Sequence, residues 1–304
     1  MKVDAVTCGN IVYLKLAEEV ARLFEEHHLS FVFLKGIALL ETVYPDLSKR
    51  FMSDVDILVP PRDLKQAILL LQQLGFESPS RTLEFMKKGE MILRVDLHDR
   101  LWFFDAKKLW GSVRPKKAGS TLTVLSPEYH LLHVALHTIL QDGCISQTAL
   151  QDGIALFHYY AREWSWERFI ALAREEGWSQ TAAIYLRELA KMEPSLIPSA
   201  DKVCHPEPKA KDLPFFGRDP SPSAQDDTPI LRQELHSYSR MILAQEKFLK
   251  KVKLLWFILF PSLGFLKWRY PFIPSFLVWL LPFVRCIDLA WKGMLTYSHA
   301  ETKR

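Results

Sequence analysis

Three aspartates are the residues of this chain best suited to chemistry. Asp54 and Asp56 stand two positions apart in a segment that continues into the apolar run 57–59, and Asp96 stands in a second apolar segment, 91–98. Side chains two apart on a strand share a face, so Asp54 and Asp56 are expected to point the same way. Adjacent carboxylates repel each other unless a cation lies between them. Oxygen ligands of this kind suit Mg²⁺, which commonly binds one or two carboxylates together with substrate phosphates. The spacing therefore predicts a divalent-metal site.

The segments that must hold these aspartates are typical of an α/β unit. Helical periodicity, short apolar runs and turn residues alternate over the first part of the chain. They predict a helix over 11–28, a strand over 31–34, a helix over 37–44, a strand over 54–59, a helix between Pro61 and Gly75, and two strands over 82–87 and 91–98. Both acidic segments are thus expected to be strands of an α/β unit of about 100 residues.

The rest of the chain is predicted to be mainly helical. Apolar residues recur at helical spacing from Pro127 onward, over 148–161, 164–176, 178–192 and 230–253. Residues 194–229 hold eight of the 18 prolines, which favours a linker or a long excursion over regular structure. We expect four parts: an α/β domain over 1–125, a helical domain over 126–193, the Pro-rich stretch 194–229, and a C-terminal helical segment over 230–304 that packs on the body.

Residues 254–284 are the most apolar part of the sequence. The apolar runs are interrupted by Lys267 and Arg269 and by four prolines. They are therefore shorter than the ~20 residues that span a bilayer, and no transmembrane span is expected. Two interpretations remain open: a buried helical pair, or a surface for peripheral membrane contact or a partner.

Composition excludes some function classes. The formal net charge of +4 and the scattered basic residues show no strong nucleic-acid signal. The four cysteines are far apart and form no Cys-x-x-Cys pair, which argues against a zinc knuckle or a redox motif. The first residues lead into a polar stretch rather than the apolar run of a signal peptide, and we expect a cytoplasmic protein.

A set of short motifs resembles one family. The set comprises Leu34-Lys35-Gly36, Tyr44-Pro45-Asp46, Arg50-x-x-x-Asp54-x-Asp56, Gly75-Phe76 and Val95-Asp96-Leu97-His98, and it continues at 126–133, at Asp152 and at 268–271. As an ensemble it is similar to the uncharacterised nucleotidyltransferase family of the DNA polymerase β-like superfamily. The resemblance implies an α+β fold, with a small mixed sheet, packed helices and a mainly helical C-terminal part.

The resemblance also implies a two-metal active site. Asp54 and Asp56 would be shared ligands of two Mg²⁺ or Mn²⁺ ions, and Asp96 would complete the catalytic metal and help to deprotonate the acceptor hydroxyl. The superfamily usually has Gly-Ser or Gly-Gly after the first strand, whereas this chain has Lys35-Gly36. Gly36 still permits close approach of the backbone, and Lys35 could act as a point charge on phosphate.

The remaining candidates have two interpretations each. Arg50 could contact phosphate or pair with an aspartate. His98 could bind metal, position substrate or only form a hydrogen bond, and Asp152 could face the site or form a salt bridge. The histidines at 130, 133 and 137 have helical spacing, but they lack an obvious acidic fourth ligand and are expected to be packed or hydrogen-bonded.

The leading hypothesis is a nucleotidyltransferase that moves an NMP group from an NTP, with ATP the expected donor, to an acceptor hydroxyl and releases pyrophosphate. The acceptor could be a small molecule, a sugar, a peptide or a protein. One alternative is a non-catalytic nucleotide- or partner-binding module, in one version at a membrane surface. A glycosyltransferase with an Asp-x-Asp metal motif is a weaker alternative, because few residues precede the motif.

Overall fold

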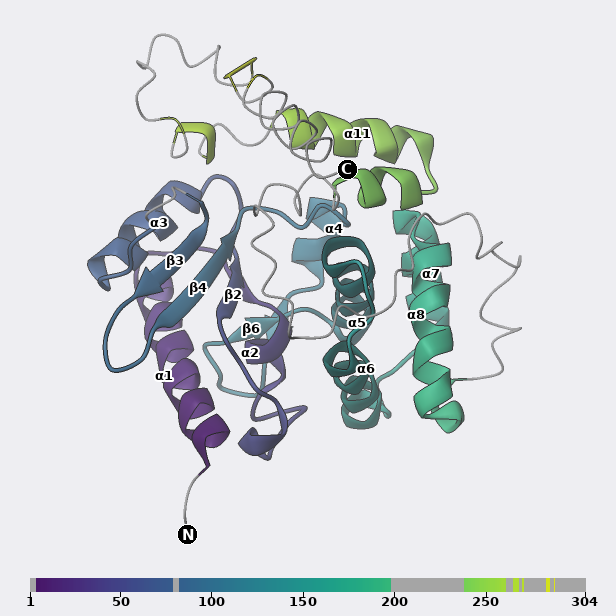
Figure 1. Ribbon diagram of the computed structural model, residues 1–304, viewed down its shortest axis with the longest axis horizontal. Coiled ribbons are helices and arrows are strands. Elements are labelled where there is room, and N and C mark those ends of the chain that lie inside the picture. The colour runs from purple at the N-terminus through teal and green to yellow at the C-terminus, as the bar shows by residue number, and fades with distance from the viewer. Residues whose placement is uncertain are drawn as a thin grey trace, which may run out of the picture. The chain divides into compact units, whose positions relative to one another are not determined.

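The computed structural model describes residues 4–78, 82–197, 238–260, 265–267, 270, 283, 284 and 287 (Figure 1). The chain forms two compact units. The first consists of Met1–Leu131 and Gln151–Ser165, and the second of Leu132–Leu150 and Trp166–Arg304. The four-part division expected from the sequence stays a prediction.

The first unit contains a small mixed sheet with helices packed around it. Asp4 caps the first helix by accepting a hydrogen bond from the backbone N–H of Thr7. The elements in chain order are α1 (Ala5–Glu26), β1 (Val32–Phe33), α2 (Lys35–Leu39), η1 (Leu47–Lys49), β2 (Val55–Leu58), α3 (Leu64–Gln73), β3 (Glu84–Lys87), β4 (Leu93–His98), α4 (Ala106–Gly111), β5 (Arg114–Pro115) and β6 (Thr123–Val124).

Four strands form the sheet, in the order β1-β2-β4-β3. The pairs β1–β2 and β3–β4 are antiparallel, whereas the two central strands, β2 and β4, are parallel. A parallel pair needs a crossover connection, and α3 and β3 supply it here. The predicted fold class, an α+β chain with a small mixed sheet, packed helices and a helical C-terminal part, is confirmed.

The sheet is anchored in the core by its apolar residues. Val55 and Ile57 of β2 and Val95 and Leu97 of β4 are all 0 or 1% exposed. Along β4 these buried positions alternate with the partly buried Asp96 and His98. In β4, the acid and the histidine thus lie on the face opposite to Val95 and Leu97, which enter the core.

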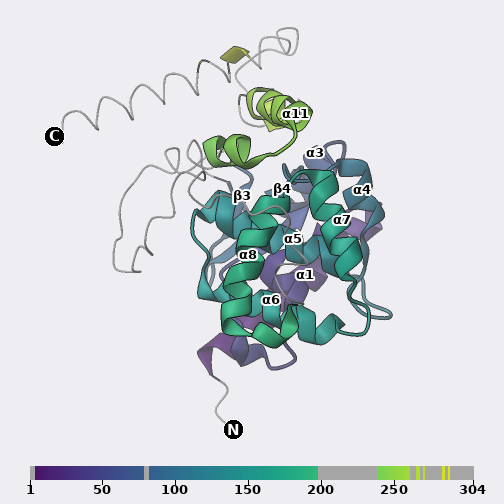
Figure 2. The ribbon, with the colours of Figure 1, turned by 90° about the vertical axis from the view of Figure 1, so that its right-hand side faces the viewer.

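The second unit is helical. Its elements include η2, a π-helical turn at His137–Asp142, then α7 (Trp166–Glu176), α8 (Ser179–Met192), the short η3 (Pro194–Leu196) and α11 (Phe248–Leu259). The chain passes between the units three times: within α5 (Pro127–Leu136), within α6 (Gln147–Tyr160), and between Ser165 and the start of α7. Figure 2 shows α7 and α8 side by side, and the fully buried Trp178 lies between them in the sequence.

The C-terminal expectations are met only in part. Residues 238–244 are helical, but 245–247 interrupt the helix expected over 230–253, and α11 begins at Phe248. The described residues leave out most of the Pro-rich stretch 194–229. They also leave out most of 254–284 beyond Phe260, including residues 268 and 269 of the late family motif. In the part of the chain that is described, no helix has the length and apolar character needed to cross a bilayer.

Candidate active site

The three aspartates lie on two neighbouring strands. Asp54 directly precedes β2, Asp56 lies within β2, and Asp96 lies within β4. The register of the parallel pair places Asp56 opposite Asp96. Neighbouring strands are about 4.8 Å apart, and opposite residues point to the same side. The structure therefore makes Asp56 and Asp96 direct neighbours, with Asp54 just before β2.

A fourth carboxylate, which the sequence analysis missed, extends this acidic row. Glu84 of β3 is the register partner of Asp96 on its other side, and it is exposed. Opposite residues of an antiparallel pair also share a face. The sheet thus carries acids on three adjacent strands, with Asp96 in the middle.

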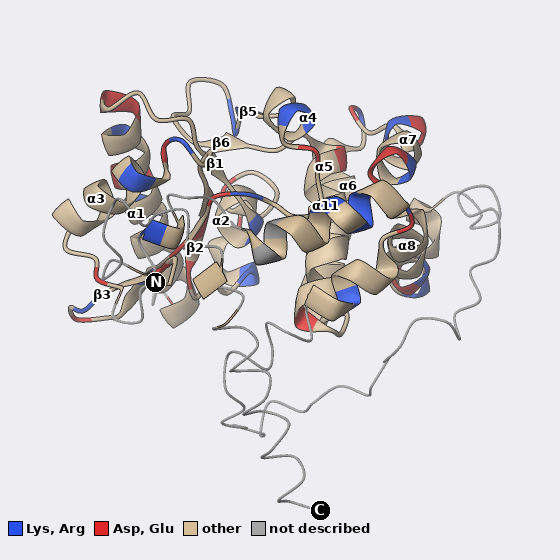
Figure 3. Ribbon diagram, turned by 90° about the horizontal axis from the view of Figure 1, so that it is seen from above, with Lys and Arg blue, Asp and Glu red and all other residues tan. Residues whose placement is uncertain are grey.

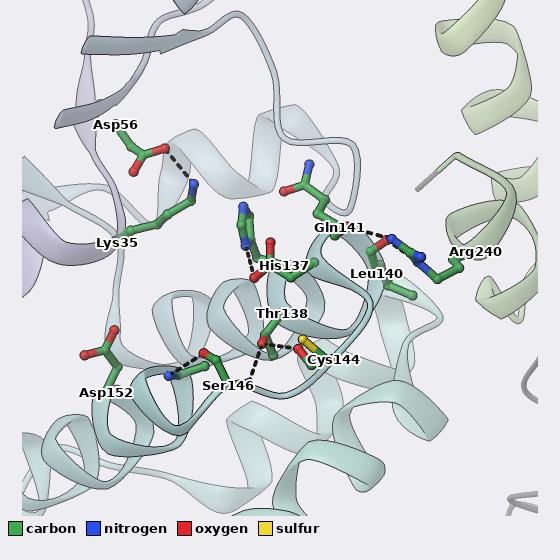
Figure 4. A network of polar contacts seen from close by, with 12 residues as sticks. Lys35, Asp56, His137, Thr138, Leu140, Gln141, Cys144, Ser146, Asp152 and Arg240 are labelled. Atoms are coloured by element: carbon green, nitrogen blue, oxygen red, sulfur yellow. Dashed lines mark hydrogen bonds and ion pairs between the residues drawn. The ribbon is translucent and has the colours of Figure 1, made fainter. Parts of the chain in front are cut away.

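Asp56 is the most enclosed member of the group. It is only 2% exposed, and its Oδ1 atom lies 2.7 Å from Lys35 Nζ and 3.0 Å from His98 Nε2. Figure 4 shows the Lys35 ammonium group extended toward this carboxylate. Burial favours the neutral acid, but Lys35 and His98 outweigh it and hold the pKa of Asp56 below its ordinary value. Asp56 is therefore a fixed negative charge at the centre of the site.

The other two carboxylates are harder to ionise. Burial, followed by repulsion from Asp56, raises the pKa of Asp96 to about 6. The same two causes raise the pKa of Asp54. Burial disfavours the charged form of Lys35, yet Asp56 raises the pKa of that ammonium group above its ordinary value. Lys35 thus acts on all three mutually repelling acids, and added positive charge beside them would relieve the repulsion.

Lys35 holds its position with a strained backbone. It begins α2 with a φ of 49°, in the left-handed region that residues with a side chain rarely adopt. Gly36 follows, and a Cβ atom added there would lie 3.2 Å from Met52 Cγ and 3.6 Å from Arg50 Nη2. The turn is therefore closely packed, and a larger residue at position 36 would force its neighbours to move.

Arg50 pairs with an aspartate. Its Nε and Nη2 atoms donate to Asp152 of α6 at 2.9 and 3.1 Å, in a bidentate ion pair. Tyr44 donates its hydroxyl to the same carboxylate at 2.9 Å. Of the two roles that the sequence left open for Arg50, the structure shows the pairing with an aspartate, and Asp152 forms a salt bridge.

Two residues of α1, which the sequence analysis did not single out, position the segment before β2. The side-chain amide of Asn10 donates to the carbonyl groups of Leu47 and Arg50 at 2.7 and 2.6 Å. Tyr13 donates its hydroxyl to the Ser53 carbonyl at 2.6 Å. Nothing in their local sequence identifies these partners, because the bonds span about 40 residues of chain.

The metal-ligand role of the acids stays a prediction. Among the described residues, no three His, Cys, Asp or Glu side chains converge closely enough to hold a metal ion. Lys35 and His98 share the Asp56 oxygen that a cation would use. The chemistry of the donor set nevertheless fits Mg²⁺ or Mn²⁺, since three carboxylates on one face already repel one another. A metal would replace Lys35 at Asp56.

The histidines at 130, 133 and 137 do not form a metal site in the described structure. His130 is buried, which lowers its pKa to about 4, so its ring is neutral. His133 and His137 contact each other edge to face, with ring centroids 5.9 Å apart. The expectation that these histidines are packed or hydrogen-bonded stays a prediction for their role; the structure shows His130 buried and His133 packed edge to face on His137.

Comparisons with known proteins agree with the resemblance drawn from the motifs. Residues 2–192 match a family model described as an uncharacterised nucleotidyltransferase. A search of curated proteins gives no match. Among solved structures, the chain is similar to an antigenic nucleotidyltransferase-like protein from Paracoccidioides brasiliensis, with 17% identity, a TM-score of 0.40, and coverage of 62% of this chain and 92% of that one. At that score, the structural likeness adds nothing to the family match.

Proposed function

We propose that this chain, which belongs to the uncharacterised nucleotidyltransferase family, transfers a nucleotidyl group from an NTP to an acceptor hydroxyl and releases pyrophosphate. The family supports nucleotidyl transfer in general. The observation that supports the metal-dependent form is the register of β2 and β4, which places Asp56 opposite Asp96, while Asp54 lies close enough to Asp56 for the two carboxylates to repel. Two-metal transfer of this kind needs carboxylates grouped around the reacting phosphate.

Each residue of the site then has a proposed task. Asp54 and Asp56 would hold Mg²⁺ or Mn²⁺ together, and Asp96 would complete the set. The metal, when bound, would stabilise the charge that develops on the α-phosphate. Lys35, which pairs with Asp56 in the metal-free protein, would act as a point charge on the triphosphate, and Gly36 would let the backbone approach it. His98 keeps its hydrogen bond to Asp56 and orients that carboxylate.

Asp96 is proposed as the proton acceptor. The acceptor hydroxyl gives its proton to Asp96 as its oxygen forms a bond to the α-phosphorus, and the bond to the pyrophosphate oxygen breaks. A base works best when its pKa lies near the working pH. Burial and Asp56 raise the pKa of Asp96 to about 6 in the metal-free protein, and a bound cation would lower it, so Asp96 would be ionised and able to accept the proton at neutral pH.

Arg50 is proposed to support the site rather than to bind nucleotide. Its guanidinium group pairs with Asp152 and donates a hydrogen bond to the Phe51 carbonyl, and its side chain is only 19% exposed. Because it packs beside Gly36, it fixes the turn that presents Lys35.

The direct test uses ATP labelled at the α-phosphate, Mg²⁺ and panels of small-molecule, sugar, peptide and protein acceptors. The wild-type chain should transfer label, with the other NTPs as comparison donors. Asp54→Asn/Asp56→Asn should reduce transfer at least ~100-fold, as expected for loss of the charge-stabilising centre. Glu90→Gln, an exposed acid outside the site, is the matched control and should retain the wild-type rate. Transfer at the wild-type rate by the double variant would refute the proposal.

A second candidate is a nucleotide-binding module without turnover. It is favoured by the ion pair between Lys35 and Asp56, which occupies the central carboxylate, and by the lack of three converging metal donors among the described residues. Calorimetry would separate the two functions. Saturable ATP binding that needs Lys35, with no label transfer to any acceptor, would favour the binding module.

A further inference from the structure

Helix α11 presents a row of large apolar side chains to the outside. Phe248, Leu249 and Trp256 are 75, 81 and 58% exposed, and Val252 and Leu255 are about half exposed, at 51 and 45%. Soluble proteins rarely expose so many neighbouring apolar side chains without a function for them. This helix contains the first part of the apolar segment 254–284, for which the sequence left a buried helical pair and an interaction surface open.

The opposite side of α11 is fixed to its own unit. Leu254 and Ile258 are buried, at 4 and 7% exposure. Lys250 forms an ion pair with the buried Glu176, and Lys247 Nζ donates to the Glu175 carbonyl at 2.8 Å. Contacts on one side therefore hold the helix against its own unit. They determine which apolar side chains face outward.

The segment just before α11 strengthens this attachment. The Glu246 N–H donates to the Gly177 carbonyl at 3.1 Å, and the Gln245 side chain donates to the Glu176 carbonyl at 3.2 Å. A Cβ atom at Gly177 would lie only 2.1 Å from Gln245 Oε1, so only glycine permits this close approach. The interruption of the helix at 245–247 thus serves to dock α11 on the turn between α7 and α8.

Lysines border the outward apolar row. With about 3.6 residues per turn, the positions of Phe248, Val252 and Leu255 form one stripe. Lys251 falls on one side of this stripe and Lys253 on the other. Residues 247–260 contain four lysines and no acidic residue, and Figure 3 shows α11 with blue segments and no red ones. Near the end of the helix, the Trp256 and Phe260 rings are stacked, with centroids 4.3 Å apart.

We propose that α11 is a docking surface for a membrane that contains anionic phospholipid. The apolar row would enter the boundary between headgroups and acyl chains, with the helix lying in the membrane plane. Lys251 and Lys253 would extend to the lipid phosphates, which attract basic side chains at the membrane surface. Trp256 suits the interface, where its ring is favoured. A bilayer matches both the apolar row and its basic borders, and α11, with 12 residues, is too short to span one.

The experiment is co-sedimentation of the full chain with sucrose-loaded vesicles. One set is pure phosphatidylcholine, and the other contains about one third phosphatidylserine, an anionic lipid. The wild-type chain should bind the anionic vesicles and lose this binding as salt is raised. Leu249→Ser/Trp256→Ser and, separately, Lys251→Glu/Lys253→Glu should each lower the partition coefficient about tenfold or more.

Matched controls separate the surface from folding and from catalysis. Leu69→Ser removes an apolar side chain that is 49% exposed on α3. Lys65→Glu/Lys107→Glu reverses the charge of two exposed lysines elsewhere. Both control variants should bind vesicles as the wild type does. Because Leu249, Lys253 and Trp256 are exposed and Lys251 is partly exposed, thermal unfolding should change little. Asp54→Asn/Asp56→Asn should also retain vesicle binding, since the docking surface does not depend on nucleotidyl transfer.

Three results would overturn the proposal. The first is equal binding to the two vesicle types, and the second is unchanged anionic binding by both α11 variants. The third is a concentration-dependent dimer, seen by sedimentation velocity, that the α11 variants dissociate while the wild type binds no vesicles. That result would assign the apolar row to a second copy of the chain.

Discussion

Arg50 and Asp152, 102 positions apart in the sequence, meet in a bidentate ion pair at the edge of the candidate site. Asp152 is 3% exposed, and Tyr44 donates a further hydrogen bond to it. Burial raises the pKa of Asp152 above its ordinary value against the opposing effect of Arg50. The pair joins the loop before β2 to α6, so the position of the Lys35-Gly36 turn depends on a helix far along the chain.

Removing one partner of this pair should be costly. Asp152→Ala leaves the Arg50 guanidinium group buried without its counter-charge, and we expect it to lower the free energy of unfolding by about 3 kcal/mol. Tyr44→Phe is the matched control, because it removes one hydrogen bond and should cost about 1 kcal/mol. Urea denaturation followed by circular dichroism measures both. Equal small losses in the two variants would show that the pair contributes little to stability.

The raised pKa of Asp96 predicts a pH-dependent stability in metal-free protein. Between about pH 4 and 6, folded Asp96 keeps a proton that the unfolded chain has released. Stability should therefore fall as the pH rises through this window. The slope should be smaller in Asp96→Asn and unchanged in Glu90→Gln. Saturating Mg²⁺ should also reduce it, because a cation favours the ionised carboxylate. Parallel curves for wild type and Asp96→Asn would contradict this assignment.

Lys35 should affect metal and nucleotide binding in opposite directions. Lys35→Met frees Asp56 from its ammonium partner, so Mn²⁺ alone should bind about tenfold more tightly, whereas ATP should bind about tenfold more weakly without the point charge. Electron paramagnetic resonance measures free Mn²⁺, and calorimetry measures ATP binding. Lys49→Met, at an exposed position, is the control for loss of a positive charge. If Mn²⁺ affinity stayed the same in Lys35→Met, Lys35 would not compete with the cation.

The buried Lys116 should make the stability of the protein depend on pH in the alkaline range as well. Its side chain is 1% exposed and donates to the Ile37 carbonyl of α2 at 3.0 Å. Burial lowers its pKa from 10.5 to about 8. Between about pH 8 and 10.5 the unfolded chain binds a proton that the folded chain lacks, so Lys116 should make stability rise with pH. Lys116→Met should lack this rise, and Lys117→Met, at a 53% exposed side chain, should keep it. Thermal unfolding across this range would show the difference.

Local patterns were enough to predict much of the site. Asp54 and Asp56 could be predicted to share one face because they stand two apart beside an apolar run. Asp96 could be placed on a strand because the apolar residues Val95 and Leu97 flank it. These signals depend only on neighbours in the sequence, and the same periodicities predicted an α/β unit followed by helices, while the small mixed sheet was implied by the family resemblance.

The long-range partners could not be predicted in this way. No pattern around Arg50 indicates that Asp152 will neutralise it, and the buried Lys116 looks like any lysine in a turn-rich segment. Similarly, the apolar run beginning at Leu254 does not reveal which of its sides faces the body. Each outcome depends on contacts made only after distant segments pack, such as the docking of Gln245 on Glu176.

The parallel pairing of β2 and β4 has a consequence for how the chain folds. The two strands cannot meet through a tight turn, because α3 and β3 lie between them in the sequence. Non-local contacts of this kind form slowly, because the chain loses the entropy of a long loop before any contact between the strands stabilises it. Asp56 and Asp96 therefore become neighbours late on the folding pathway, and their repulsion adds to the barrier. A divalent cation present during refolding should speed the pairing of β2 with β4. The ion proposed for catalysis would then also promote formation of the site during folding.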